Sequence, residues 1–287
     1  MTTPDAYTRM RGMHHHARAC LAVGVDATAP EAWGWRGRTL GLPVLTSAGQ
    51  PAWLRLACAV RGAVAETFWD GALAAEDAIP VSVPRPRLLA HHDFTDQRWV
   101  YRAELYERVD GFQITAGPVL AAEPGLPDSW WAELSAAVED VGRVRTRRFT
   151  TQQRYLDRAM PRFLGSPIST TAPSWTTAHG DLHWANLYGP DLQIGDWEGW
   201  GRAPTGYDAA VLHTHSLLVP RTAARIRDTF PVLDTAEGRF AELAVITQTL
   251  DATTRGDHLH LADALRDRAA RLLERSLPAL EAVTSAR

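Results

Sequence analysis

The chain has 287 residues, of which 45% are hydrophobic, and a formal net charge of −3 at pH 7. This length suits one large domain or two small ones, and the charge lacks the basic footprint of a nucleic-acid-binding protein. No run of about 18 apolar residues occurs, so no membrane span is expected. Charged residues near the N-terminus argue against a signal peptide. We therefore expect a cytoplasmic protein, monomeric, that binds neither nucleic acid nor membranes.

Cysteine, histidine and lysine usage restrict the chemistry further. Cys20 and Cys58 have apolar neighbours, which predicts buried free thiols rather than a disulfide or a metal site. The His14-His-His16 run is interpreted as the exposed face of a helix. The sequence contains no lysine, so its 30 basic residues are all arginine. Any function that commonly uses a lysine must therefore use another residue here.

The first part of the chain is predicted to be mainly β structure. Strand-like runs lie between turn signals, and Ser47–Gln50 predicts a hairpin between two of them. Asp110-Gly111 ends this part. The expected elements, in chain order, are a helix over 5–23, β structure over 33–60 with paired strands at 39–46 and 51–58, a helix over 64–79, an extended connector over 81–87, and strands over 88–90 and 100–109.

The remainder is predicted to be mainly helical, with one short hairpin. Gly189-Pro190-Asp191 is a turn signal between two short apolar runs, so the hairpin should occupy 187–194. Apolar residues at helical spacing account for most of the other segments. Helices are expected over 129–144, 150–164, 208–230, 236–253 and 257–283.

The segment with the strongest chemical signal is His179-Gly-Asp-Leu-His-Trp-Ala-Asn186, followed by Asp196-Trp-Glu198. The predicted hairpin returns the chain to its start, so Asp196 should lie beside Asn186. Phosphoryl transfer needs a carboxylate near the acceptor hydroxyl and metal ions that neutralise phosphate charge. Mg²⁺ prefers oxygen ligands and commonly takes only one or two from the protein. Asp181, Asn186 and Asp196 fit these needs.

This pattern resembles the aminoglycoside phosphotransferase and choline kinase branch of the protein-kinase-like fold. The resemblance implies an α+β bilobal fold, with a mainly β N-lobe over 1–111, a hinge near 106–111 and a mainly helical C-lobe over 112–287. It also implies that Asp181 is the catalytic base and that Asn186 and Asp196 bind Mg²⁺. His179 would be structural, and Asp208, in Pro204-Thr-Gly-Tyr-Asp208, would open a helix and brace the active-site loops.

The nucleotide-binding part departs from the family pattern. The resemblance places a phosphate-binding lysine on the third strand, where this chain has Arg55; arginine can bind phosphate but is larger and planar. The glycines of Gly34-Trp-Arg-Gly37 and Gly41 lack diagnostic spacing. Backbone groups of the hinge, at Glu107 and Val109, would meet the nucleobase. The sequence does not decide which helical carboxylate would pair with Arg55: the candidates are Glu66, Asp70 and Glu76.

The resulting hypothesis is an enzyme that transfers the γ-phosphoryl group of ATP or GTP to a hydroxyl of a small molecule. The resemblance suggests an antibiotic or related natural product, in resistance or biosynthesis. His183 and Glu198 are interpreted as supporting residues. The tryptophans near the motif, Trp197 and Trp200, favour packing over substrate stacking. Substrate-contact candidates are Glu198, Trp200, Asp251 and Asp257.

Three alternatives remain open at this stage. The acceptor could be a Ser or Thr of a peptide, since kinase-like enzymes of this branch also act on such hydroxyls. Arg55 and the weak glycine loop would suit a nucleotide-binding pseudokinase. On a strand, His179, Asp181 and His183 would share one face and could hold a transition metal in a hydrolase.

Overall fold

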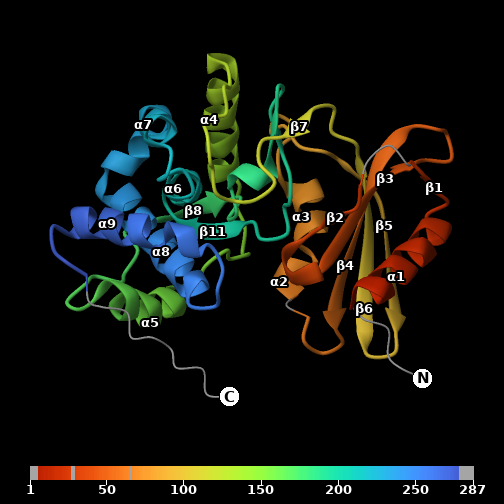
Figure 1. Ribbon diagram of the computed structural model, residues 1–287, viewed down its shortest axis with the longest axis horizontal. Coiled ribbons are helices and arrows are strands. Elements are labelled where there is room, and N and C mark those ends of the chain that lie inside the picture. Colours follow the sequence, from red (N-terminus) through yellow and green to blue (C-terminus); the bar gives the residue numbers. More distant parts are fainter. Residues whose placement is uncertain (1–5, 27–29, 65, 278–287) are drawn as a thin grey trace. The chain divides into compact units, whose positions relative to one another are not determined.

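The computed structural model describes residues 6–26, 30–64 and 66–277, which form two compact units (Figure 1). Unit 1 comprises Met1–Asp77 and Arg85–Asp110, and unit 2 comprises Ala78–Pro84 and Gly111–Arg287. The expected division at 111 thus needs one refinement, because Ala78–Pro84 clusters with unit 2. Two hydrogen bonds tie it there, from Ile194 N to Pro84 O (2.9 Å) and from Ser82 Oγ to Asp140 Oδ2 (2.7 Å). Among the helices of these described ranges, none is long and apolar enough to cross a bilayer.

Unit 1 is an antiparallel sheet with one long helix and two short ones. The sheet order is β1-β3-β4-β6-β5, and β2 pairs with β3. The strands alternate inward and outward residues, as strand periodicity requires. The elements are α1 (Ala6–Cys20), β1 (Gly24–Val25), β2 (Ala32–Trp33), β3 (Thr39–Leu45), β4 (Pro51–Val60), α2 (Glu66–Trp69), α3 (Gly71–Ala78), β5 (Leu88–Asp96) and β6 (Trp99–Glu107).

The two faces of this sheet differ in chemistry. Helix α1 covers one face (Figure 1), where Met10 and Ala17 pack with the buried Leu54 and Tyr101 of β4 and β6. The next residues along each strand, such as Arg55 and Arg102, point to the opposite face because successive side chains alternate. That second face therefore carries the polar groups of unit 1.

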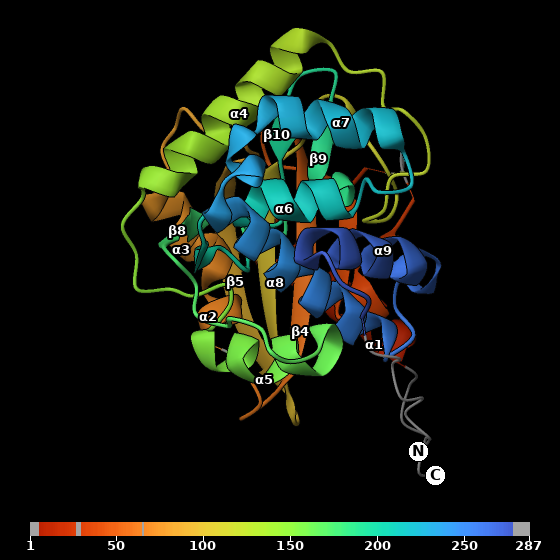
Figure 2. The ribbon, with the colours of Figure 1, turned by 90° about the vertical axis from the view of Figure 1, so that its left-hand side faces the viewer.

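Unit 2 is mainly helical, as predicted. It contains two small sheets, β10-β9-β7 and β11-β8. Figure 2 shows α6 and α8 side by side, and α8 also packs on α5 and α9. The elements are β7 (Phe112–Gln113), α4 (Asp128–Arg143), α5 (Gln153–Leu164), β8 (Trp175–Ala178), β9 (Leu187–Gly189), β10 (Gln193–Ile194), β11 (Gly201–Pro204), α6 (Tyr207–Thr214), α7 (Pro220–Thr229), α8 (Ala236–Thr253) and α9 (Ala262–Leu273).

Two predicted helices are each divided in two. The helix expected over 64–79 is interrupted between α2 and α3, at Asp70-Gly71. The helix expected over 208–230 ends at Thr214, and α7 begins at Pro220. Proline lacks an N–H and suits the first turn of a helix, so Pro220 starts a new helix instead of continuing α6. Residues 278–283 of the last predicted helix, and residue 5 of the first, lie outside the described ranges.

Two predictions about α1 and its surroundings were wrong. Cys20 is exposed, and only Cys58 is buried. His14 is buried, and its Nε2 lies 3.1 Å from Leu54 O on β4. The run of three histidines spans both faces of the helix, so one ring must point toward the sheet. Sequence neighbours along a helix do not share a single face.

A cluster of tryptophans anchors the motif segment within unit 2. The Trp184 ring, fully buried, stacks on Trp130 at 6.4 Å and meets Trp131 edge-on at 6.0 Å. Trp184 Nε1 donates to Ser216 Oγ (2.8 Å), and Trp130 Nε1 donates to Tyr188 O (2.9 Å). Buried indoles normally find such partners. These contacts fix both the motif loop and the hairpin that follows it.

Candidate functional site

The predicted hairpin forms and brings the two ends of the motif together. Strands β9 and β10 pair Leu187 with Ile194. Gly195 N then donates to Asn186 O (2.8 Å), so Asp196 follows directly beside Asn186. Asp196 is exposed and has φ +60°, a left-handed conformation that non-glycine residues rarely adopt. Such strain is frequent at functional positions.

His179 connects these two parts of the site. It is 1% exposed, its Nε2 lies 2.9 Å from Gly195 O, and its Nδ1 accepts from Asp181 N at 3.2 Å. Burial lowers the pKa of His179 below its ordinary value. A neutral ring with the proton on Nε2 satisfies both bonds. Both ring nitrogens of His179 have partners, so the ring offers no free nitrogen to the metal of the hydrolase alternative.

Asp181 is the exposed carboxylate at the centre of the site. Its side chain is 55% exposed, and its Oδ2 lies 3.3 Å from His183 Nε2. Desolvation by the surrounding residues would raise the pKa of Asp181. The charge and hydrogen bond of His183 outweigh this effect and lower the pKa to about 2. Asp181 is therefore a carboxylate at neutral pH and can accept a proton.

Asn186 is oriented by hydrogen bonds to Asp181. Its Nδ2 donates to Asp181 O (2.8 Å) and more weakly to Asp181 Oδ2 (3.4 Å). Since the amide nitrogen is committed, the amide oxygen remains as an acceptor. With the exposed carboxylate of Asp196, it gives two hard oxygen ligands, which is the donor set that Mg²⁺ accepts from a protein. Within the described ranges, no group of three or more His, Cys, Asp and Glu side chains could hold a metal ion.

Asp208, at the start of α6, fixes the backbone of the motif. Its Oδ2 accepts from His179 N (2.7 Å) and its Oδ1 accepts from Gly180 N (2.9 Å). The side chain is buried, and burial raises the pKa of Asp208 above its ordinary value despite these bonds. Both oxygens are thus used to hold the turn that leads to Asp181.

We expect Asp208→Asn to lower the free energy of unfolding by about 1–3 kcal/mol, because an amide leaves one buried backbone N–H facing another donor. Thermal and urea unfolding would measure the loss. The matched control is Asp228→Asn, which changes an exposed carboxylate of α7 and should alter stability by less than about 0.5 kcal/mol. Equal stability of Asp208→Asn and wild type would contradict the bracing role.

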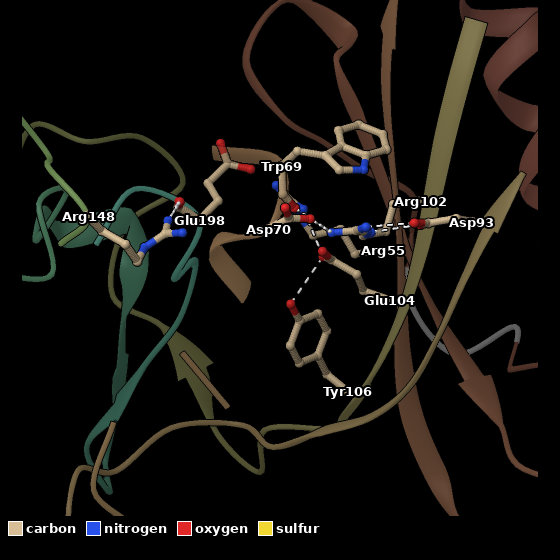
Figure 3. A network of polar contacts seen from close by, with 9 residues as sticks. All are labelled: Arg55, Trp69, Asp70, Asp93, Arg102, Glu104, Tyr106, Arg148 and Glu198. Carbon is tan, nitrogen blue, oxygen red and sulfur yellow. Dashed lines mark hydrogen bonds and ion pairs between the residues drawn. The ribbon is translucent and has the colours of Figure 1, made fainter. Parts of the chain in front are cut away.

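The segment after Asp196 is held by two residues that the sequence did not single out. Arg148 Nε donates to Trp200 O and its Nη2 to Glu198 O, each at 3.1 Å, as Figure 3 shows for the pair with Glu198. Thr150 Oγ1 donates to Gly199 O (2.6 Å). These bonds involve backbone carbonyls far away in sequence, so no local pattern could reveal them.

The tryptophans near this segment serve packing. Trp197 is 6% exposed and Trp200 2%, and Trp197 Nε1 donates to Ile194 O (2.8 Å). The guanidinium of Arg148 covers the Trp200 ring at 5.1 Å. A ring this buried offers little surface to a substrate, which favours packing over a substrate contact for Trp200. Asp251, another candidate, lies near the end of α8 and pairs with Arg255 at 2.6 Å, and Asp257 lies in the turn that follows the helix.

In unit 1, Arg55 pairs with a carboxylate of the neighbouring strand. Its Nη1 lies 2.9 Å from Glu104 Oε2, which also accepts from Tyr106 Oη at 3.1 Å (Figure 3). The Arg55 side chain is 17% exposed and that of Glu104 3%. The cation on β4 is thus neutralised by a cross-strand residue that the sequence did not predict as its partner.

Two of the three helical candidates have other partners. Asp70 binds Arg102, which also binds Asp93, and this network is visible in Figure 3. Glu76 binds Arg85 (2.8 Å) and Arg87. The side chain of the third candidate, Glu66, lies outside what the structure describes.

The glycines between 34 and 41 lie in a turn or beside a large side chain, and the expected hinge residues lie at or just beyond the end of β6. Gly34 and Gly37 lie in the turn between β2 and β3, where Gly37 N donates to Gly34 O (3.0 Å). A Cβ at Gly41 would come within 2.5 Å of the Trp53 ring, so this glycine makes room for an indole. Glu107 ends β6 and its N donates to Arg87 O (3.0 Å), while Val109 lies just beyond, half-buried.

Comparison with known proteins gives the fold. No protein-family profile and no curated protein sequence matches the chain. An amicoumacin kinase in complex with AMP-PNP, Ca²⁺ and Ami superposes with a TM-score of 0.58 at 14% identity, over 92% of this chain and 95% of that chain. A macrolide 2′-phosphotransferase from Brachybacterium faecium gives 0.41 at 13% identity (95% and 99% covered), and a MAP kinase from Leishmania major 0.37 at 13% (98% and 79%). The first superposition confirms the α+β, protein-kinase-like fold that the motif resemblance implied.

Proposed function

Because the chain has the protein-kinase-like fold, we propose that it transfers the γ-phosphoryl group of ATP or GTP to a hydroxyl of a small molecule. The observation that carries the proposal is the assembly of Asp181, Asn186 and Asp196 on one loop and hairpin of unit 2. Each of these oxygen-bearing groups is placed by its own hydrogen bond or turn. A chance arrangement of surface carboxylates would not need the buried supports of His179 and Asp208.

The chemistry follows from the state of each residue. Asp181 is ionised and exposed, so it can orient the acceptor hydroxyl and take its proton as the oxygen attacks the γ-phosphorus. Asn186 and Asp196 would hold Mg²⁺, which neutralises charge on the phosphate oxygens when it is bound. His183 keeps Asp181 ionised, and Arg148 and Thr150 hold the backbone beyond Asp196.

The nucleotide would be bound with help from unit 1. Arg55 is proposed to contact phosphate in place of a lysine, and the backbone at Glu107 and Val109 to contact the base. A guanidinium can bind phosphate through two parallel hydrogen bonds. Its pairing with Glu104 lowers its availability, which is the observation that favours a second candidate, a nucleotide-binding pseudokinase. Multiple turnovers with any acceptor would exclude that second candidate.

The acceptor is proposed to be an antibiotic or related natural product. The likeness to an amicoumacin kinase supports a small-molecule acceptor, and the family resemblance supports the same class. A Ser or Thr in a peptide stays as the alternative acceptor. Mass spectrometry of the products would separate these acceptor classes, because it shows which kind of molecule has gained a phosphoryl group.

The test is ligand-dependent thermal unfolding of wild type and Asp196→Ala, with ATP, GTP or neither, and with or without Mg²⁺. A ligand that binds only the folded state stabilises it by about 2.7 kcal/mol at 100 times its Kd. We expect an Mg²⁺-dependent rise in the unfolding midpoint for wild type that is lost in Asp196→Ala.

The matched control is Asp191→Ala, which removes an exposed carboxylate in the turn of the same hairpin. Its midpoint should rise with Mg²⁺ and nucleotide as much as that of wild type. If wild type shows no shift with either nucleotide, the chain does not bind nucleoside triphosphates and the proposal fails.

A further inference from the structure

A cavity of about 160 Å³ lies between helix α1 and the edge of the sheet in unit 1. Helix α1 packs on β3 and β4, and β1 pairs with β3 at the edge of the sheet (Figure 1). An engineered apolar cavity of about 150 Å³ holds benzene, so a cavity of this size admits a ligand with one small ring. The described residues that line it come from α1, β1, β3 and the segment before β2: Arg11, His14, Arg18, Val25, Glu31, Leu40, Leu42 and Pro43.

The cavity has a buried floor and an exposed rim. His14 is 2% exposed and Leu40 is fully buried, whereas Val25 is 54% exposed and the Arg11 side chain 55%. The cavity therefore opens to solvent beside Val25 and Arg11, and a ligand that enters there reaches His14. Apolar walls with a few polar groups are typical of sites that bind small molecules.

The lining of this cavity carries more positive than negative charge. Glu31 is the carboxylate among its described residues. Arg11 Nε donates to Glu31 Oε1 (2.9 Å) and Arg11 Nη2 to Glu31 Oε2 (2.9 Å), and Trp33 Nε1 also donates to Oε2 (3.1 Å). Both oxygens of Glu31 are therefore in use. Arg18 supplies a second guanidinium, so the described lining has two cations and one carboxylate.

Arg18 is the group that a ligand would satisfy. Its Nε is buried without a hydrogen-bond partner among the described residues. Buried donors of this kind are uncommon and call for an explanation such as a missing ligand. His14 lacks this need, because its Nε2 lies 3.1 Å from Leu54 O and burial lowers the pKa of His14, which keeps the ring neutral at pH 7. The Nε and one Nη of a guanidinium form an edge that binds a carboxylate through two parallel hydrogen bonds.

We propose that this cavity binds a small monocarboxylate whose apolar body is about the size of one ring. The carboxylate pairs with Arg18, and the ring lies against Leu40 and Leu42 of β3. An uncharged ligand of the same shape leaves the charge of Arg18 uncompensated, and an ammonium ligand meets a like charge. The site goes beyond the phosphotransferase function, since it lies wholly within unit 1 and no residue proposed for phosphoryl transfer lines it.

The experiment is isothermal titration of the full chain at pH 7, without nucleotide or Mg²⁺. The probes are benzoate and cyclohexanecarboxylate, with benzamide as the uncharged counterpart, benzylamine as the ammonium counterpart and acetate as a carboxylate without a ring. We expect benzoate and cyclohexanecarboxylate to bind about 10- to 100-fold more tightly than benzamide, the effect of hydrogen bonds to a charged group. Benzylamine and acetate should each bind more weakly than benzoate.

Three variants separate charge, shape and overall fold. Arg18→Gln should lower the affinity for benzoate by about 10- to 100-fold and leave that for benzamide within about threefold, because only benzoate has a charge to pair. Leu42→Phe fills the cavity and should lower the affinity for both ligands. Arg61→Gln is the matched control, because it removes an equal charge from an exposed arginine in the turn after β4, and it should bind benzoate as wild type does. Circular dichroism and the unfolding midpoint without ligand would verify that each variant is folded.

Several results would overturn the inference. Wild type that binds neither benzoate nor cyclohexanecarboxylate has no such site, and equal affinities for benzoate and benzamide would show that charge is not recognised. An unchanged affinity for benzoate in Arg18→Gln, or an equal loss for benzoate and benzamide, would remove Arg18 as the partner of the carboxylate. An unchanged affinity in Leu42→Phe would place the bound carboxylate elsewhere on the chain.

Discussion

Replacing Asp181 by Asn is expected to lower the rate of acceptor phosphorylation by about 10²–10⁴-fold, the contribution typical of a positioned acid or base. The physical reason is the loss of the ionised, exposed carboxylate of the motif loop. His179 of the same loop and Asp208 of α6 are buried, and hydrogen bonds occupy their polar atoms. An amide of the same shape keeps the hydrogen-bonding frame but cannot take a proton. Steady-state rates with a saturating acceptor would measure the change.

Nucleotide binding should survive this substitution, because Asn186 and Asp196 are untouched. The thermal midpoint of Asp181→Asn with Mg²⁺ and nucleotide should therefore rise as in wild type. Asp191→Asn serves as the control of equal charge change in the same region, and it should keep the full rate. A rate for Asp181→Asn within about threefold of wild type would remove Asp181 from the role of base.

Local sequence signals predicted the part of the site that is local in structure. The turn residues Gly189-Pro190-Asp191 and the short apolar runs beside them specify a two-stranded hairpin. Its register then determines that Asp196 follows directly beside Asn186. The longer strands and helices have strong periodic patterns, and most of them are predicted. The exceptions include the breaks at Asp70-Gly71 and Pro220, β5, which runs to Asp96 instead of ending at 90, the last helix, which begins at Ala262 instead of 257, and the short strands β7, β8 and β11, which are not predicted.

The parts that the sequence could not predict are set by contacts between distant segments. The partner of Arg55 is Glu104 because the β4–β6 register places these residues opposite each other. The family pattern alone points to a helical carboxylate as the partner instead. In the same way, Arg148 clamps the segment after Asp196 through backbone carbonyls, which leave no trace in residue types. The rings of His183, His215 and His258 lie 5.8 and 5.9 Å apart, centroid to centroid, and this proximity likewise depends on how α6 and α8 pack.

A buried ionic cluster in unit 2 leads to the second large effect. Glu242 on α8 is fully buried, and its carboxylate accepts from Arg268 of α9 through two hydrogen bonds of 2.6 and 2.8 Å. His213 Nδ1 of α6 lies 2.8 Å from the same carboxylate. Arg227 Nη1 of α7 lies 3.9 Å from it, so the cluster joins four helices at one carboxylate.

We expect Glu242→Gln to lower the free energy of unfolding by about 3–5 kcal/mol, because removing one partner of a buried ion pair leaves the others uncompensated. This is a large share of the roughly 5–15 kcal/mol that stabilises a typical domain. Urea unfolding at pH 7 would measure it. Glu237→Gln is the matched control, since Glu237 is only partly buried in the first turn of the same helix and should change stability by less than about 0.5 kcal/mol.

The same cluster predicts a pH dependence with a definite sign. Burial opposes ionisation of Glu242, but the hydrogen bonds from Arg268 and the His213 ring 2.8 Å away outweigh it and lower its pKa to about 2. A lowered folded-state pKa gives stability that is complete above the unfolded value and is lost as the pH falls toward the folded value. The advantage of wild type over Glu242→Gln should therefore persist at neutral pH and shrink between about pH 4.5 and pH 2. An advantage that stayed constant across this window would show that the charge of Glu242 does not stabilise the fold, and that its contribution comes from shape and hydrogen bonding alone.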